Sequence, residues 1–192
     1  MRDRLDLEPV TRFVAFLRGV NVGAAGRGRK SVPMADLRAQ AEALGWSAVR
    51  TYIQSGNLVF DSRAKASALE SVLESAISEH FGFDVPVIVR RASDLQRARA
   101  GCPFEPEALE RPNLVHIGFA KSKWSPDLVA SLEPYARHGE RVALVGSALW
   151  TDFPNGVARS KITPAVFDRS AGSPVTLRNI KTLDAVLELC GS

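Results

Sequence analysis

The feature that most constrains this chain of 192 residues is an order of strand-like and helix-like segments that occurs twice. Short apolar runs rich in β-branched and aromatic residues indicate strands, and apolar residues at spacings of three and four indicate helices. The first half has strand patterns at 12–17, 49–53, 58–60 and 85–89 and helical patterns at 33–44 and 66–80. This order, βαββαβ, is that of the ferredoxin-like fold.

The second half repeats the order with little residue identity to the first. Its strand patterns lie at 114–119, 141–145, 148–151 and 175–178, and its helical patterns at 125–135, 160–167 and 179–189. Ser125, Ser160 and Asn179 are the expected N-caps of these three helices.

We therefore predict an α+β chain of two ferredoxin-like βαββαβ subdomains in tandem, with mixed or antiparallel sheets. Residues 1–100 form the first subdomain with a short connecting helix near 93–99, residues 101–112 form a connecting segment, and residues 113–192 form the second subdomain with a C-terminal helix.

The charge balance favours an anionic partner only mildly. The chain has 25 Lys and Arg against 21 Asp and Glu, a formal net charge of +4. Residues 12–30 contain no acidic side chain, but they do contain Arg12, Arg18, Arg27, Arg29 and Lys30. Such a run is typical of an anion-binding site, and equally of a solvated basic loop.

Cysteine and histidine usage argues against a disulfide framework or a zinc site. Cys102 and Cys190 are far apart, and no Cys or His lies at ligand spacing from either. No segment approaches the ~20 apolar residues of a membrane span, and the first apolar run is too short for a signal peptide. We expect a cytoplasmic protein without cofactor or bound metal, with no membrane partner, as a monomer or weak homodimer.

The first candidate site is the glycine-containing loop that follows the first strand. Arg18, Gly19, Asn21, Gly23 and Lys30 lie between this strand and the first helix. Backbone N–H groups near glycines and at a helix N-terminus can bind phosphate or carboxylate, and Arg18 and Lys30 add full charges. Neither the Walker nor the Rossmann glycine pattern is present. The alternative is a strand-to-helix loop with no ligand.

The second candidate is the segment 50–57, which ends in the predicted hairpin turn at 55–57. Tyr52 and Gln54 project from the same face if the strand continues through both, and Ser55 and Asn57 add polar groups. A polar recognition surface would result. Turn chemistry alone also accounts for Ser55, Gly56 and Asn57.

Two further candidates lie in the second half. Lys161 follows the expected cap Ser160, although a cation in a first helical turn is disfavoured unless it is exposed or an anion is held there. Arg178 ends the last predicted strand and Asn179 begins the last predicted helix, and besides a functional role, a surface charge and a helix cap explain them equally well. No nucleophile elbow or Ser/Cys–His pair is evident, so no catalytic residue and no reaction are predicted.

Taken together, these blocks resemble a bacterial family, the domain of unknown function DUF1697. The blocks that carry the resemblance are FLRGVNVG at 16–23, VPMADLR at 32–38, TYIQSGNLVF at 51–60, PNG at 154–156, SK at 160–161 and TLRN at 176–179. It spans residues 12–189 and implies two ferredoxin-like subdomains, but no established activity. Ile180 stands where family members commonly have Trp, and the loop 24–29 is longer and more basic than usual.

The function that these observations favour is binding of a small anionic or phosphorylated ligand in a cleft lined by these loops. An alternative is RNA or single-stranded nucleic-acid binding, because ferredoxin-like sheets stack bases on strand aromatics, although residues 56–60 lack the aromatic pair. The other alternative is a protein-interaction module without catalytic activity.

Overall fold

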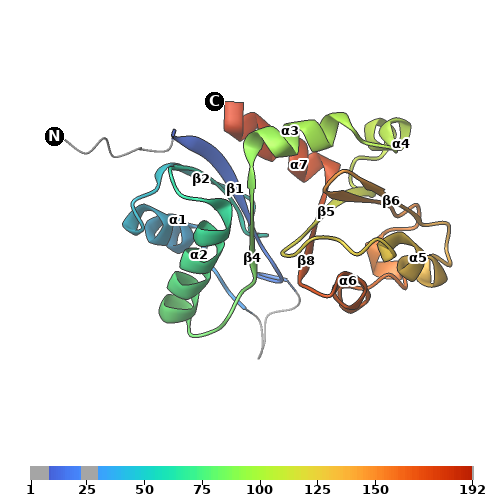
Figure 1. The fold of residues 1–192 in the computed structure, drawn as a ribbon, viewed down its shortest axis with the longest axis horizontal. Coiled ribbons are helices and arrows are strands. Elements are labelled where there is room, and N and C mark those ends of the chain that lie inside the picture. Colours follow the sequence, from blue (N-terminus) through green and yellow to red (C-terminus); the bar gives the residue numbers. More distant parts are fainter. Residues whose placement is uncertain (1–8, 23–29, 192) are drawn as a thin grey trace. The chain divides into compact units, whose positions relative to one another are not determined.

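The computed structural model describes residues 9–22 and 30–191, and the chain divides into two compact units, Met1–Ala92 and Ser93–Ser192 (Figure 1). Each unit has one four-stranded sheet. Within the described residues, no helix is long and apolar enough to cross a membrane.

The first unit has the predicted element order. Its elements are β1 (Thr11–Leu17), α1 (Met34–Ala43), β2 (Ser47–Tyr52), β3 (Asn57–Ser62), α2 (Ala66–Phe81) and β4 (Val87–Arg91). The strand order is β2-β3-β1-β4, and every neighbouring pair is antiparallel. The first and third strands are therefore central, and β2 and β4 form the edges.

The second unit repeats this topology and adds helices at both of its ends. Its elements are α3 (Ala92–Ala100), α4 (Glu105–Glu110), β5 (Val115–Ala120), α5 (Leu128–Leu132), the 3-10 turn η1 (Glu133–Tyr135), β6 (Arg141–Val145), β7 (Ala148–Asp152), the 3-10 turn η2 (Val157–Arg159), α6 (Pro164–Ala171), β8 (Val175–Asn179) and α7 (Ile180–Gly191). The antiparallel order β6-β7-β5-β8 matches that of the first sheet strand for strand. The predicted α+β class with tandem ferredoxin-like halves is confirmed.

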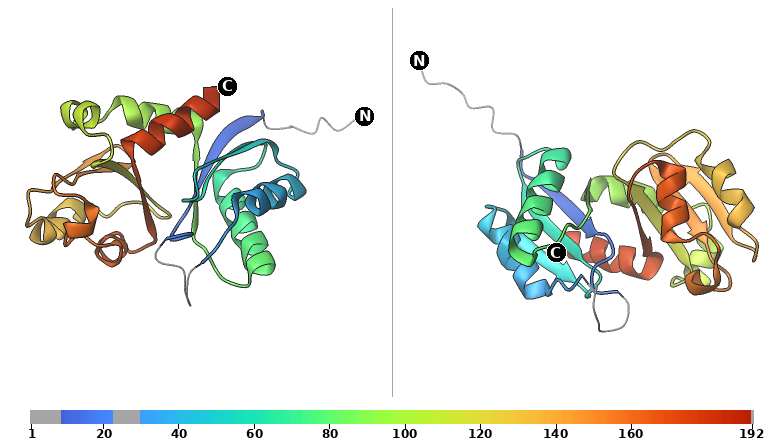
Figure 2. Two further views of the ribbon diagram at one scale, coloured as in Figure 1. Left: turned by 180° about the vertical axis from the view of Figure 1, so that it is seen from behind. Right: turned by 90° about the horizontal axis from the view of Figure 1, so that it is seen from below.

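Each sheet packs one face against the pair of helices within its βαββαβ order. In the first unit, α1 and α2 lie on the same side of the sheet (Figure 2), and Trp46 stacks on Phe60 with 4.0 Å between ring centroids. In the second unit, Leu149 of β7 and Phe153, which directly follows this strand, pack with Phe167 of α6. Burial of these aromatic side chains is worth several kcal/mol for each core.

Two helix starts differ from the prediction. Helix α6 begins at Pro164 and is capped by the Thr163 hydroxyl, which accepts the Val166 N–H, so Ser160 is not its N-cap. Helix α5 begins at Leu128 after Asp127, which places Ser125 outside its cap position. Both errors arise because several Ser, Thr and Asp residues precede each helix and compete for the same role.

The third predicted cap is confirmed. The Asn179 Oδ1 atom accepts the Thr182 N–H at 2.9 Å at the start of α7.

The division between the units lies after Ala92, the first residue of α3, whereas the sequence predicts this helix at the end of the first subdomain. Arg99 of α3 forms ion pairs at 2.7 Å with Glu105 of α4 and at 2.8 Å with Asp184 of α7. These bonds attach α3 to the helices of the second unit. The segment 101–112, expected to be a connection, contains α4.

Carboxylates of the second helix cap the edge strand in both units. Glu74 and Glu70 of α2 accept the backbone N–H groups of Val87 and Val89 on β4, each at 2.8 Å. In the second unit, Asp168 of α6 accepts the N–H of Val175 on β8 at 2.9 Å. Main-chain donors that would otherwise be open at β4 and β8 are thus satisfied within each unit.

Candidate functional site

The loops that carry the first two sequence candidates lie at one end of the first sheet. The Leu17 N–H donates to the Gly56 carbonyl at 2.8 Å, which joins the end of β1 to the β2–β3 turn. The Arg18 N–H donates to the Pro86 carbonyl at 3.0 Å, which joins the same strand end to the segment before β4. The β1–α1 segment, the β2–β3 turn and the segment before β4 therefore form one loop cluster.

Asn21 is the brace of this loop cluster. Its Nδ2 donates to the carbonyls of Val32 at 2.8 Å and Gln54 at 2.7 Å, and its Oδ1 accepts the Val32 N–H at 2.9 Å. Its own N–H donates to the Lys30 carbonyl at 2.8 Å. The residue has φ of 56°, a left-handed conformation that Asn tolerates well. The amide is fully used in holding loops together.

Asn57 is a second brace, and it is buried rather than displayed. Its side chain is 0% exposed, and its Nδ2 donates to the Tyr52 carbonyl and to the Ser55 Oγ, each at 3.0 Å. The expected recognition surface on which Asn57 would lie is therefore not present at this position. The amide instead holds the turn between β2 and β3.

Gly56 is required by close approach as well as by its conformation. It has φ of +74°, and a Cβ built there would lie 2.6 Å from the Leu17 Cβ and 2.8 Å from the Val20 Cγ2. No other residue allows the turn to approach β1 this closely.

Ile53 is the strained residue of the loop cluster. It has φ of 45° although its side chain is β-branched, and that side chain is 50% exposed. A left-handed conformation is an outlier for such a residue. Strand β2 ends at Tyr52, so Gln54 lies in the turn and does not share a strand face with Tyr52, contrary to the prediction.

The remaining candidates in the first unit are at or near the surface. The Lys30 ammonium donates to the Asp84 carbonyl, while the Asp84 carboxylate accepts the Ser78 hydroxyl at 2.8 Å. Arg18 is half-buried, and Gly19, with φ of 70°, is exposed. Gly23 lies outside the described residues.

In the second unit, Ser160 has a structural bonding pattern. The side chain is buried, and its Oγ accepts the Ile162 N–H at 3.0 Å. Burial alone would raise the pKa of Glu140, but hydrogen bonds from the Ser160 hydroxyl and the His138 N–H outweigh it and hold this pKa below its usual value. Lys161 is exposed, in agreement with the alternative reading of that residue.

Arg178 is buried on β8. Its Nη1 donates to the Thr176 hydroxyl at 2.8 Å and to the Leu177 carbonyl at 2.9 Å. Burial lowers the pKa of its guanidinium to about 10. Asn179, which is partly buried, caps α7 as described above.

Sequence reasoning missed an ionic cluster in the second unit. The side chain of Asp152, only 2% exposed, accepts bonds from Arg111 at 2.7 and 2.8 Å and from Arg141 at 2.8 and 3.2 Å. Arg141 also pairs with Glu107 and lies over the Phe104 ring, 4.6 Å from its centroid. These residues are far apart along the chain, and no sequence motif predicts that they form a cluster. It joins α4 to β6 and β7.

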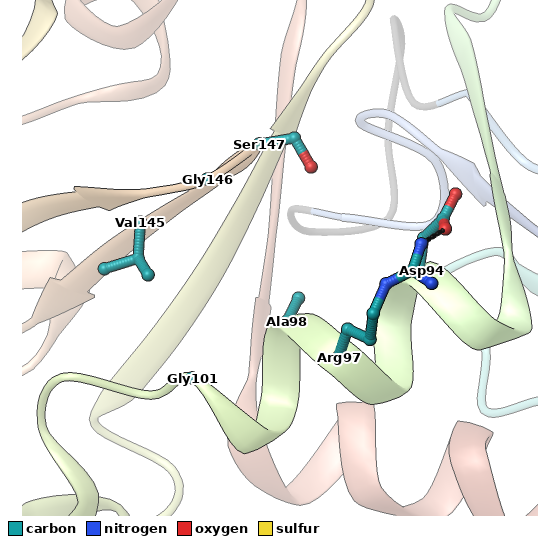
Figure 3. A pocket seen from close by; sticks show the side chains of 7 residues that line it. All are labelled: Asp94, Arg97, Ala98, Gly101, Val145, Gly146 and Ser147. Carbon is teal, nitrogen blue, oxygen red and sulfur yellow. Dashed lines mark hydrogen bonds and ion pairs between the residues drawn. The ribbon is translucent and has the colours of Figure 1, made fainter.

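Two hollows in the described part of the surface are lined by residues other than the predicted ones. A pocket of about 240 Å³ lies between α3 and the β6–β7 turn, and Figure 3 shows Arg97 and Asp94, an ion pair, on its helical side. A larger apolar hollow of about 480 Å³ lies beside Trp46 in the first unit. Within residues 9–22 and 30–191, no group of three His, Cys, Asp or Glu residues could hold a metal.

Comparisons with known proteins agree with the fold. A family model described as a protein of unknown function (DUF1697) matches residues 10–150, which confirms the resemblance drawn from the sequence. A conserved bacterial protein, SP0830 from Streptococcus pneumoniae, superposes with a TM-score of 0.72 at 23% identity, covering 95% of this chain and 99% of that one.

An unknown protein from Galdieria sulphuraria aligns with a TM-score of 0.27 at 13% identity, covering 90% of this chain and 99% of that one. No curated protein matches the chain.

Proposed function

The chain belongs to the DUF1697 family, and from the geometry of its first unit we propose that the loop cluster binds a small anionic ligand, most favourably one that carries a phosphate. The residues proposed to contact the ligand are the side chains at the surface of the cluster, Arg18, Lys30, Tyr52 and Gln54. Asn21, Gly56 and Asn57 hold these residues in place. No reaction is proposed.

The observation that carries the proposal is the strained conformation of Ile53. A turn that only reversed the chain would have Gly or Asn at a position with φ of 45°, at lower cost. Strain of this kind costs about 1–3 kcal/mol, and it is typical of ligand-binding and active-site loops whose surroundings enforce it. Here the carbonyls on either side, of Tyr52 and Gln54, are held by the two asparagine braces.

The electrostatics of the cluster favour an anion. Lys30 has three N–H donors, and its bond within the described residues is to a carbonyl, which is a neutral acceptor. Arg18 adds a planar guanidinium suited to phosphate oxygens, and the exposed Gln54 amide adds a neutral donor.

Nucleic-acid binding through the sheet is less well supported. The face of the first sheet opposite α1 and α2 presents Val14, Phe16 and Val59 from its central strands, each at most 1% exposed. Base stacking on such a sheet requires accessible aromatic rings. The cytoplasmic location stays a prediction.

A thermal-shift titration of the full chain with inorganic phosphate, nucleoside phosphates and sugar phosphates tests the proposal. At ~100 times its dissociation constant, a bound ligand adds about 2.7 kcal/mol of stability. The shift should disappear in Arg18→Ala and Lys30→Ala. It should persist in Lys65→Ala, a matched control, because this exposed lysine follows the far end of β3.

The Ile53→Gly variant tests whether the strained backbone at Ile53 contributes to ligand binding. Because Gly adopts positive φ without strain, this variant should be at least as stable as the parent while binding the ligand more weakly. Equal affinity in Ile53→Gly would remove the argument from strain. Absence of a shift with every compound in the parent chain would overturn the proposal.

A further inference from the structure

Four strands lie at sheet edges, β2 and β4 in the first unit and β6 and β8 in the second. An edge strand presents main-chain N–H and C=O groups that can pair with another chain unless something obstructs them. Three of these edges carry an obstruction. Two of them, β4 and β8, are capped by helix carboxylates, at Val87 and Val89 and at Val175.

The third obstructed edge, β2, is irregular. Its pairing with β3 shifts register between Ser47 and Arg50, and Ala48 within that interval has φ of 50°. A bulge of this kind bends the strand and interrupts the row of outward groups that a partner strand would need.

The edge of β6 is regular throughout. It pairs with β7 in unbroken register, from Arg141 opposite Asp152 to Val145 opposite Ala148. The two-residue turn between them begins with Gly146 at φ of +59°, as tight hairpin turns require.

In such a hairpin, residues that bond to the neighbouring strand alternate with residues whose main-chain groups point outward, starting from the bonded pair that flanks the turn. The outward groups of β6 are therefore those of Val142 and Leu144. No main-chain bond outside the hairpin reaches either residue from the part of the chain that the structure describes.

We propose that β6 binds β6 of a second copy of this chain, antiparallel, about a twofold axis that passes through Ala143. In this register, Val142 lies opposite Leu144 of the partner subunit, and the outward groups of both residues meet their complements. Ala143 lies opposite itself and is small enough for close approach. The strand has one charged residue, Arg141, and it lies opposite Val145 of the partner subunit, so no like charges face each other.

The pairing is isologous and closes on itself, as a twofold interface must. A strand of five residues buries far less than the roughly 1,600 Å² of a standard interface, so the dimer is weak and depends on concentration. The proposal concerns the second unit and is independent of the ligand proposed for the loop cluster of the first.

Sedimentation analysis of the full chain from micromolar to millimolar concentration measures the dimer, and a charge pair at Val145 tests its register. Val145 is 40% exposed, and we expect its substitution to change the stability of the fold little. Val145→Lys places like charges opposite Arg141 of the partner subunit and should weaken the dimer roughly threefold, whereas Val145→Glu should strengthen it by a similar factor. Val157→Lys, at a residue 38% exposed and outside β6, is the matched control and should change nothing.

Amide hydrogen exchange gives a second readout at single residues. The Val142 and Leu144 amides should become protected as concentration rises, while the Ala143 amide, bonded to β7, is protected throughout. A chain that stays monomeric at millimolar concentration would overturn the proposal. So would a dimer that responds equally to Lys and Glu at position 145, or protection that arises only on addition of an unrelated strand peptide.

Discussion

The Glu70 carboxylate of α2 accepts the backbone N–H of Val89 on β4 at 2.8 Å, so that a helix side chain completes the hydrogen bonding of an edge strand. Both groups are buried, with Glu70 7% and Val89 0% exposed. Glu74 of the same helix accepts the N–H of Val87, the first residue of β4, and Asp168 forms the corresponding bond to Val175, the first residue of β8, although the two halves share little sequence. Capping of the last strand by a helix carboxylate therefore follows from the topology that the two units share, in which the second helix lies along the last strand.

Removal of the Glu70 carboxylate should destabilise the protein. Glu70→Ala leaves a buried N–H without an acceptor, which costs about 1–3 kcal/mol, and Glu70→Gln should cost less because the amide oxygen can still accept. Urea unfolding of the full chain measures both. Glu79→Ala, on the same helix but exposed, is the control and should lie within about 0.5 kcal/mol of the parent. Equal stability of the Glu70→Ala and Glu79→Ala variants would contradict the assigned role.

A comparison of Gly56 with Gly146 distinguishes the cost of a positive φ from the cost of steric overlap with a neighbouring strand. Both have positive φ, but a Cβ meets Leu17 at 2.6 Å at the first and nothing within 4 Å at the second. Gly146→Ala should therefore cost about 1–2 kcal/mol for the backbone alone. Gly56→Ala should cost a further 1–3 kcal/mol or so for the overlap with β1. Similar midpoints of thermal unfolding for the two variants would count against the close approach.

Asp152 should be among the most sensitive charged residues of the second unit. Asp152→Ala leaves Arg111 and Arg141, which are partly exposed, without their shared carboxylate, and the expected loss is about 1.5–3 kcal/mol. The exposed pair of Asp94 and Arg97 provides the contrast, since Asp94→Ala should cost no more than about 1 kcal/mol. Denaturant unfolding decides between them, and a loss below 1 kcal/mol at Asp152 would mean that the cluster is not a structural one.

His116 should make the stability depend on pH. Burial lowers the pKa of its imidazole below 6.5, against opposing contributions from the Leu114 carbonyl and Asp152. The unfolded chain therefore takes up this proton at a higher pH than the folded chain does. The stability associated with the neutral ring is complete above pH 6.5 and is lost as pH falls from 6.5 through the lower pKa of the folded state.

Unfolding free energies measured between pH 8 and pH 5 should fall less in His116→Asn than in the parent, because the variant has no ring to protonate. The parent and the His116→Asn variant must be measured in the same buffers, since carboxylates also make the unfolding free energy depend on pH at the acid end of this range. An identical slope in the two proteins would show that His116 binds its proton equally well in both states.

The fold was predictable because periodicity alone distinguishes the elements. The spacing of Leu69, Leu73 and Ile77 predicts α2, and these residues are buried against the sheet as the pattern requires. Strand order then follows from the βαββαβ sequence of elements, which has few compact solutions. Helix starts were less predictable, because Ser160 and Thr163 are equally good caps by type and only the contacts of Ser160 with Ile162 and Glu140 decide between them.

The sequence identifies the loops of the cluster but not the roles of their polar residues. The sequence singles out Asn21 and Asn57 as polar groups in loops, which suits recognition and bracing equally. Their use as braces depends on carbonyls of Val32, Gln54 and Tyr52, and main-chain acceptors have no signature in a sequence. The strain at Ile53 is likewise a consequence of the assembled loops, since nothing in the residue type indicates positive φ.

The central position of β1 has a consequence for synthesis on the ribosome. β1 is translated before β4, with which it pairs, so one side of β1 stays open until Val87–Arg91 has emerged. During that interval Phe13, Val14 and Phe16 offer an apolar strand to any nascent chain or chaperone nearby. The same delay in strand pairing occurs in the second unit, because β5 pairs with β8, which is translated later. The sheet of each half is therefore completed only when its last strand, β4 or β8, has been synthesised.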